Sequence, residues 1–331
     1  MKGQLGSLGL NAALLIALAG VFVASLLAGE VWLAPAAIYR GLWAASRPDL
    51  AGLIVRDLRL PRALLACLVG GTLGLSGAVL QGITRNPLAE PGLLGVSAGA
   101  ALGAVVAIYF GIATLTVVAL PVLGLAGALG ACLLTFALGR NGGTIALVLA
   151  GAAVSAAAAA CISLALNLAP SPYAAYEIMS WLMGSLADRS WSQVWLVLPF
   201  ILAGCALLAV LGRSLDALSL GEQQAASLGV DLQRLNAQAI LGTALAVGAA
   251  TSISGAIGFI GLVAPHLVRP LVRHQPSRTL LPAALLGALL LLCADIATRM
   301  LPVDLKVGVL TSLVGSPFFF WLVVRLRKVA P

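Results

Sequence analysis

The stretch TIALVLAGAAVSAAAAACISLALNL, from Thr144 to Leu168, contains no charged side chain. A helix needs about 20 mostly apolar residues to cross a bilayer. Backbone groups in lipid must pair with one another, so only helices and closed barrels span membranes. The stretch lacks the strict alternation of polar and apolar residues that a barrel strand shows. It therefore predicts a transmembrane α-helix.

The rest of the chain has the same character. Of its 331 residues, 61% are hydrophobic and 9% are charged, whereas a soluble domain carries roughly 25% charged residues. The sequence predicts an all-α integral membrane protein whose single transmembrane domain covers residues 1–331. The net charge is +8, but Lys and Arg lie mainly between apolar runs, where they fix orientation or meet lipid head groups. We expect no nucleic-acid partner.

Apolar runs predict about ten transmembrane helices. They lie near Leu8–Gly29, Pro61–Gln81, Gly92–Phe110, Thr114–Leu138, Thr144–Leu168, Trp191–Leu211, Asn236–Ala250, Gly255–Val272, Leu280–Met300 and Val307–Val324. The first run follows Lys2, and no good cleavage site follows it, so we interpret it as a retained span rather than a signal peptide. Glycines and Pro265 interrupt the eighth run, which is typical of helices that line a pathway.

The distribution of basic residues predicts the orientation. An even number of spans places both termini on one side, and the basic C-terminal tail favours the cytoplasm. One group of arginines breaks this pattern because it precedes the second span, on the opposite side. Its members are Arg40, Arg47, Arg56, Arg59 and Arg62. A binding partner explains this concentration of charge better than topology does, although Asp57 and lipid phosphates are an alternative.

The sequence offers no energy source of its own. Ion-coupled carriers use carboxylates buried within their spans, and only Asp295 lies well inside a run, with Arg299 one helical turn away as an ion-pair partner. This argues against an ion-coupled secondary transporter, which is the alternative to a transporter driven by ATP. A phosphate-binding loop needs Gly-Lys followed by Ser or Thr, and none of the lysines follows a glycine. We expect a non-catalytic subunit, without catalytic residues, that is driven by a separate ATPase.

Cysteine and histidine do not predict a metal site. Cys67, Cys132, Cys161, Cys205 and Cys293 are odd in number and widely separated, and each lies in an apolar run. Such cysteines are usually small packing residues. For His266, near the end of a span, a structural or coupling role is favoured over iron ligation.

An ATPase needs a docking surface, and residues 213–235, between the sixth and seventh spans, form the best candidate. Within this segment, Leu220 to Val230 reads as a short helix that Gly229 ends. A plain connector is the alternative.

Several motifs resemble the bacterial FecCD-like and BtuC-like permeases, which import iron-siderophores, haem and cobalamin. They are RLPR at 59–62, NPLAEPGLLGVSAGA at 86–100, LG and LGV at 220–221 and 228–230, GAIGFIGLVAPH at 255–266, Asp295 with Arg299, and GVLT through GSPFF at 308–319. They keep their order and spacing across nearly the whole chain. Lys306 departs from the pattern, because relatives usually have proline there.

The resemblance implies a type II ABC importer permease fold in the bacterial inner membrane. It implies a second copy of the chain, two cytoplasmic ATPase subunits and a periplasmic substrate-binding protein as partners. The chain itself would bind no cofactor, since ATP and Mg belong to the partner ATPase. The cargo would be an iron chelate moved by alternating access, with haem favoured and siderophore or cobalamin as alternatives.

The resemblance also assigns residues. Asn86 and Leu88 would form the cytoplasmic gate. Arg56, Arg59 and Arg299 would receive acidic residues of the binding protein, while Arg62 would face its own subunit. The ATPase-coupling residues would be Leu220, Gly221, Glu222, Ala225, Ala226, Leu228 and Gly229.

Overall fold

The computed structural model describes residues 2–29, 31–36, 38–39, 50–116, 118–139 and 142–327. Regular structure within these ranges is entirely helical. Arg40 and Arg47, which belong to the predicted arginine group, lie outside the described residues, as does Lys328 in the basic tail.

One group of helices follows the predicted spans in order. They are α1 (Lys2–Leu27), α4 (Leu60–Thr84), α5 (Val96–Tyr109), α6 (Ala119–Gly139), α7 (Gly143–Asn167), α9 (Trp191–Ala209), α12 (Leu232–Ser254), α13 (Ile260–Val268), α14 (Pro276–Met300) and α15 (Val307–Arg327). In the described residues, 7 helices are long and apolar enough to cross a membrane, and the segments of α5, α13 and α15 are shorter apolar helices. The all-α membrane class is confirmed.

Shorter elements connect these helices. They are α3 (Leu50–Leu53), the π-helix η1 (Ile54–Arg59), η2 (Pro91–Leu94), η3 (Ile112–Thr114), α8 (Pro172–Leu182), α10 (Gly212–Leu218), α11 (Glu222–Ser227) and η4 (Arg269–Val272). Helix α8 was not predicted from the sequence, because it is too short for a span. Its start is nevertheless well defined, because Ser171 accepts a hydrogen bond from Ala174 N at 3.1 Å and Pro172 occupies the first turn.

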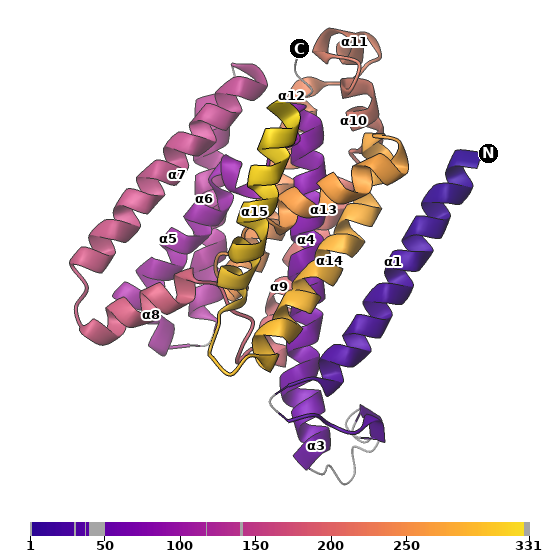
Figure 1. Cartoon of the computed structure of the whole chain (residues 1–331). Coiled ribbons are helices and arrows are strands. Elements are labelled where there is room, and N and C mark those ends of the chain that lie inside the picture. Colours follow the sequence, from indigo (N-terminus) through magenta and orange to yellow (C-terminus); the bar gives the residue numbers. More distant parts are fainter. Residues whose placement is uncertain are drawn as a thin grey trace.

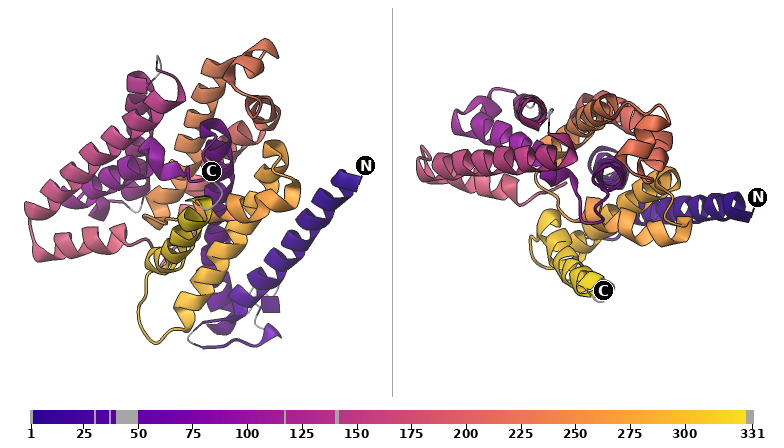
Figure 2. Two further views of the ribbon diagram at one scale, coloured as in Figure 1. Left: turned by 45° about the horizontal axis from the view of Figure 1, so that its top comes forward. Right: turned by 90° about the horizontal axis from the view of Figure 1, so that it is seen from above.

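Helices α4 and α12 form the centre of the bundle. In the apolar part of each of these two spans, 78% of the residues are buried inside the protein. Helix α14 lies alongside α4, α6 packs between α5 and α12, and α9 packs against α12 (Figure 1). Helix α1 inclines outward, so that its N-terminal part stands away from the bundle, and α15 projects on another side (Figure 2).

The bundle has two distinct ends. We call the end that holds α10 and α11 the coupling end; the start of α1 and the end of α15 point the same way (Figure 1). The opposite end, where η1 leads into α4 and where α14 finishes, holds Arg56, Arg59, Arg62 and Arg299. We call it the arginine end.

Glycines bring α4 and α14 into backbone contact. A Cβ added to Gly70 would overlap the carbonyl oxygen of Gly287, and one added to Gly74 would overlap that of Ala283. Small residues permit such close approach between helices in lipid. Gly70 and Gly74 therefore serve packing within the subunit.

Candidate functional sites at the two ends of the bundle

A buried carboxylate organises the arginine end. Asp295 has no exposed surface, and its Oδ1 accepts a hydrogen bond from Arg62 Nε at 2.8 Å. Its Oδ2 lies 3.1 Å from Arg299 Nη2. The sequence predicted the Asp295–Arg299 pair from its spacing, and Arg62 is a second partner from another helix. Two guanidinium groups compensate for the cost of burying this charge.

Arg299 also holds the end of α1. Its Nη1 donates to the carbonyl oxygens of Ser25 and Ala28 at 2.9 and 3.0 Å, and its Nη2 donates to Ser25 Oγ at 2.5 Å. The last carbonyls of a helix lack partners within the helix and carry a partial negative charge, so a cation stabilises them. Only 10% of the Arg299 side chain is exposed.

Arg59 binds the same end of α1. Its Nη1 donates to the carbonyl oxygens of Leu26 and Leu27 at 3.1 and 2.6 Å, and its Nη2 donates to that of Val31 at 2.7 Å. Arg56, in contrast, has 54% of its side chain exposed and lies 4.0 Å from Asp57. Of the three predicted docking arginines, Arg56 is the one that presents its guanidinium to the outside.

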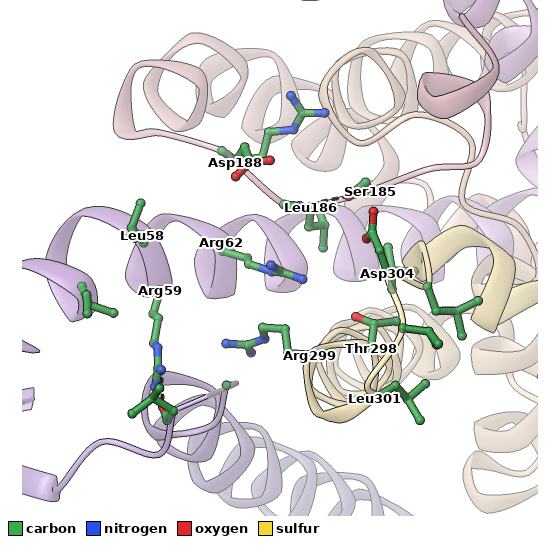
Figure 3. Close-up of a pocket in the computed structure, with 18 of the residues that line it drawn as sticks. Leu58, Arg59, Arg62, Ser185, Leu186, Asp188, Thr298, Arg299, Leu301 and Asp304 are labelled. Atoms are coloured by element: carbon green, nitrogen blue, oxygen red, sulfur yellow. Dashed lines mark hydrogen bonds between the residues drawn. The ribbon is translucent and has the colours of Figure 1, made fainter. Parts of the chain in front are cut away.

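A cavity of about 750 Å³ opens at the arginine end. Arg62 and Arg299 project toward the same space from α4 and α14, whereas Arg59 turns toward the end of α1 (Figure 3). The loops at 185–189 and 301–305 complete the wall and contribute Asp188 and Asp304. The charged residues that line the cavity are therefore four arginines and two aspartates, namely Arg59, Arg62, Arg189, Arg299, Asp188 and Asp304.

At the other end of α4, the predicted gate begins with a tight turn. Arg85 ends the helix with a left-handed backbone, at φ 49°. Asn86 Oδ1 then accepts a hydrogen bond from Leu88 N at 2.9 Å, across Pro87. This Asx turn fixes the direction in which the chain leaves α4. Asn86 is exposed and Leu88 is partly buried.

Glu90 connects this gate segment to α13. It is partly buried and accepts a hydrogen bond from the backbone N–H of Phe259, the residue that caps α13 with φ 67°. Burial raises the pKa of Glu90, and the hydrogen bond from Phe259 lowers it by less. Phe259 in turn packs against Gly315, where an added Cβ would overlap its ring. The gate segment is thereby linked to α13 and α15.

The predicted ATPase-coupling residues divide into a surface and a core. Leu220 and Leu228 are 63% and 65% exposed on either side of α11, and Ala226 is also exposed. Ala225 has no exposed surface and packs with the buried Leu215 and other apolar residues of α4, α10, α12 and α14. Gly221 and Gly229 bound α11 with φ of 115° and 85°, which favour glycine.

The coupling end touches the gate directly. Glu222, the first residue of α11, lies with its Oε1 3.6 Å from Arg85 Nη2. Arg85 immediately precedes Asn86, so a charged contact joins the two predicted sites. Both side chains are about half exposed.

A groove that was not predicted from the sequence lies beside α15. Its volume is about 630 Å³. Its lining residues come from α8, α15 and the loop before α13, and they are Leu182, Met183, Ala256, Gly258, Gly308, Val309, Ser312, Leu313, Ser316 and Pro317. None of them is charged. In the sequence, the small residues Gly308 and Ser312 in the last span were the feature that could have indicated this groove.

Known proteins resemble this chain over most of its length. The model of the FecCD transport family matches residues 15–325. The hemin transport system permease protein HmuU of Yersinia pestis is 41% identical over 88% of this chain and 89% of its own. The vitamin B12 import system permease protein BtuC of Salmonella typhi is 39% identical over 96% of this chain and 95% of its own. An inward-facing structure of a transporter described as metal-chelate type ABC has a TM-score of 0.85 and 32% identity, over 95% of this chain and 98% of that one.

Proposed function

The chain belongs to the FecCD transport family of ABC importer permeases, and we propose that a dimer of it carries haem from the periplasm to the cytoplasm. Siderophore and cobalamin are the alternative cargoes. Family membership makes the chain a multi-pass protein of the inner membrane and implies ATPase and binding-protein partners. We further propose that the coupling end, with both termini, faces the cytoplasm.

The observation that carries the preference for haem is the uncharged groove beside α15. Its side chains are aliphatic or small, apart from Met183 and the hydroxyls of Ser312 and Ser316. Such a lining suits a flat, mostly apolar porphyrin better than a highly charged ferric chelate, because an unpaired charge is costly to desolvate. The haem and cobalamin permeases are similarly close in sequence, at 41% and 39% identity, so identity does not carry this preference.

Helix α15 supports the proposal of a dimer. It packs against α13 and α14 on one side and stands out from the bundle (Figure 2). Leu313, Val314 and Phe320 are 61%, 67% and 72% exposed on it. A second copy placed against this helix would enclose the groove and turn it into a path between two subunits.

We propose that the arginine end receives the binding protein and that the coupling end receives the ATPase. Exposed Arg56 suits the first contact with a carboxylate, because the planar guanidinium pairs with it bidentately. Arg59 and Arg299 have partners at the end of α1, so they would act after docking has begun or by supporting Arg56. At the coupling end, Leu220, Ala226 and Leu228 form the surface that α11 offers.

Transport assays with three cargoes test this function. The chain is expressed with its ATPase and binding protein and reconstituted in liposomes, and uptake of hemin, a ferric siderophore and cyanocobalamin is measured with internal or external ATP. We expect ATP-dependent uptake of hemin that sodium and proton ionophores do not abolish. Uptake of cyanocobalamin or ferric siderophore in place of hemin would reassign the cargo.

A pair of variants tests the groove itself. Ser312→Phe fills the groove and is expected to lower hemin uptake on the order of tenfold, because the larger side chain obstructs the passage of hemin. The rate of ATP hydrolysis should not change. Leu133→Phe changes an exposed position of α6, 68% exposed and away from the groove, and should transport normally. Equal uptake by the two variants would place the path elsewhere.

A further inference from the structure

Asp216, in α10, fastens the coupling end to the start of α14. Its Oδ1 accepts a hydrogen bond from Ser277 N at 2.8 Å, and its Oδ2 accepts one from Ser277 Oγ at 2.6 Å. Gln275 Nε2 donates to the same Oδ2 at 2.8 Å. Ser277 lies in the first turn of α14, where backbone N–H groups have no partner within the helix. A carboxylate from another helix thus caps α14.

Apolar packing holds α10 in the same place. Leu215 has no exposed surface, and its side chain lies against Gly82 of α4, where an added Cβ would be 3.1 Å from it. Gly212 approaches Ser277 equally closely. Helix α10 therefore contacts α4 and α14 together.

Helices α4 and α14 have little freedom to slide past one another. At Gly70 and Gly74 the backbone of α4 meets the backbone of α14 at Gly287 and Ala283, so no longer side chain separates the two helices at these points. Close-packed elements of this kind move together or separate, and do not deform gradually.

The far end of the pair is fixed as well. Asp295 of α14 binds Arg62 of α4, and Arg299 of α14 binds the end of α1. A continuous series of contacts thus runs from α10, through α14, to the arginine end.

We propose that Asp216 is the positioning residue that joins the ATPase-coupling segment to α14, so that displacement of α10 and α11 moves α14 and the arginine end as one body. The inference rests on the proposed docking of an ATPase at α11. In this arrangement, the chemistry of Asp216 matters because an acceptor with two oxygens satisfies a backbone N–H, a hydroxyl and an amide together.

A reporter at the end of α14 tests the proposal. Met300, which is 56% exposed, is replaced by Met300→Cys in a background without the native cysteines and labelled with an environment-sensitive fluorophore. The complex with its ATPase is placed in nanodiscs, and the fluorescence change on adding ATP and vanadate is measured. Asp216→Ala should reduce this change by about fivefold or more, within the range of coupling factors between distant sites, while the ATPase still co-purifies and hydrolyses ATP.

Two further variants control for loss of structure. Asp231→Ala removes the carboxylate that caps α12 in the same segment, where Oδ1 accepts from Arg234 N at 3.0 Å, and it should keep the full fluorescence change. Ser277→Ala removes the hydroxyl donor to Asp216 and retains the backbone donor, so its change should be intermediate. This milder variant decides the question if Asp216→Ala does not fold.

Each result is decisive. A full fluorescence change in Asp216→Ala or in Ser277→Ala would overturn the proposal. Loss of the ATPase from Asp216→Ala would also overturn it, because Asp216 would then serve docking itself. Failure of the proposed docking surface would show separately, as retention of the ATPase by Ala226→Arg.

Discussion

The carboxylate of Glu222 lies 3.6 Å from the guanidinium of Arg85, so the first residue of α11 contacts the residue that ends α4. The pair is half exposed, and exposed ion pairs contribute about 0.2–1 kcal/mol to stability. Its importance lies in its position between the predicted coupling segment and the predicted gate.

We expect Glu222→Arg to lower ATP-driven transport several-fold and to change the free energy of unfolding by less than about 1 kcal/mol. The like charges would push the start of α11 away from the gate segment. Transport is measured in proteoliposomes and stability by thermal unfolding in detergent. The double variant Arg85→Glu, Glu222→Arg should recover transport; no recovery would mean that the pair does not couple the two sites.

Ala226→Arg tests the ATPase surface. The exposed position accepts the new side chain without disturbing the fold, whereas a charge at buried Ala225 would unfold the segment itself. We expect weaker co-purification of the ATPase. Gln233→Arg adds the same charge at an exposed position of α12 and should retain the ATPase. If both variants retain it, α11 is not the contact.

The gate is tested by leak. Replacing Asn86 and Leu88 together by alanine removes the Asx turn and the apolar side chain, so passive release of a trapped dye from proteoliposomes should rise without ATP. Asn86→Asp keeps the Oδ1 acceptor for Leu88 N and should remain tight. Wild-type leak in the double alanine variant would place the constriction elsewhere.

Glu90 gives a pH-dependent prediction. Because its pKa is raised in the folded protein, the protonated side chain contributes stability that is complete below its ordinary pKa of 4.5 and is lost as pH rises through the raised pKa. Glu90→Gln keeps an acceptor for Phe259 N–H and cannot ionise. The apparent Tm of wild type should therefore fall relative to Glu90→Gln as pH increases above about 4.5. Parallel curves would contradict this assignment.

Binding-protein docking should depend on Arg56 and on salt. Arg56→Glu reverses an exposed charge, so affinity should fall on the order of tenfold at low salt, with a smaller difference at high salt because exposed charges are screened. Binding is measured by surface plasmon resonance on nanodiscs. Arg59→Glu should also lower stability, since Arg59 binds the carbonyl groups of Leu26 and Leu27 in α1 and of Val31 just beyond it. Salt-independent binding would exclude a charged dock.

The sequence predicted the spans because each long apolar run has few alternatives in lipid. It also predicted the Asp295–Arg299 pair, which a single helical turn contains. It could not predict Arg62 as the second partner of Asp295, because 233 residues separate them. The same reason applies to the contacts between Asp216 and Ser277, which only the folded bundle brings together.

Which residues of a short helix are buried and which are exposed could not be predicted from the sequence. In the predicted coupling segment, Ala225 and Ala226 are adjacent and chemically identical, yet one is buried and the other exposed. Too few turns exist in α11 for a hydrophobic pattern to decide between them. Helix α8 was missed for a related reason, since 11 residues cannot produce the signal of a membrane span.

The ion pair between Arg62 and Asp295 has a consequence for biosynthesis. Ribosomes add roughly 5–20 residues per second, so the 233 residues between the two side chains take roughly 10–50 s to translate. During that interval α4 has entered the bilayer without the carboxylate that will neutralise its arginine, and without the glycine face of α14. Water, lipid phosphate or the insertion machinery must accompany the nascent helix until its partner emerges.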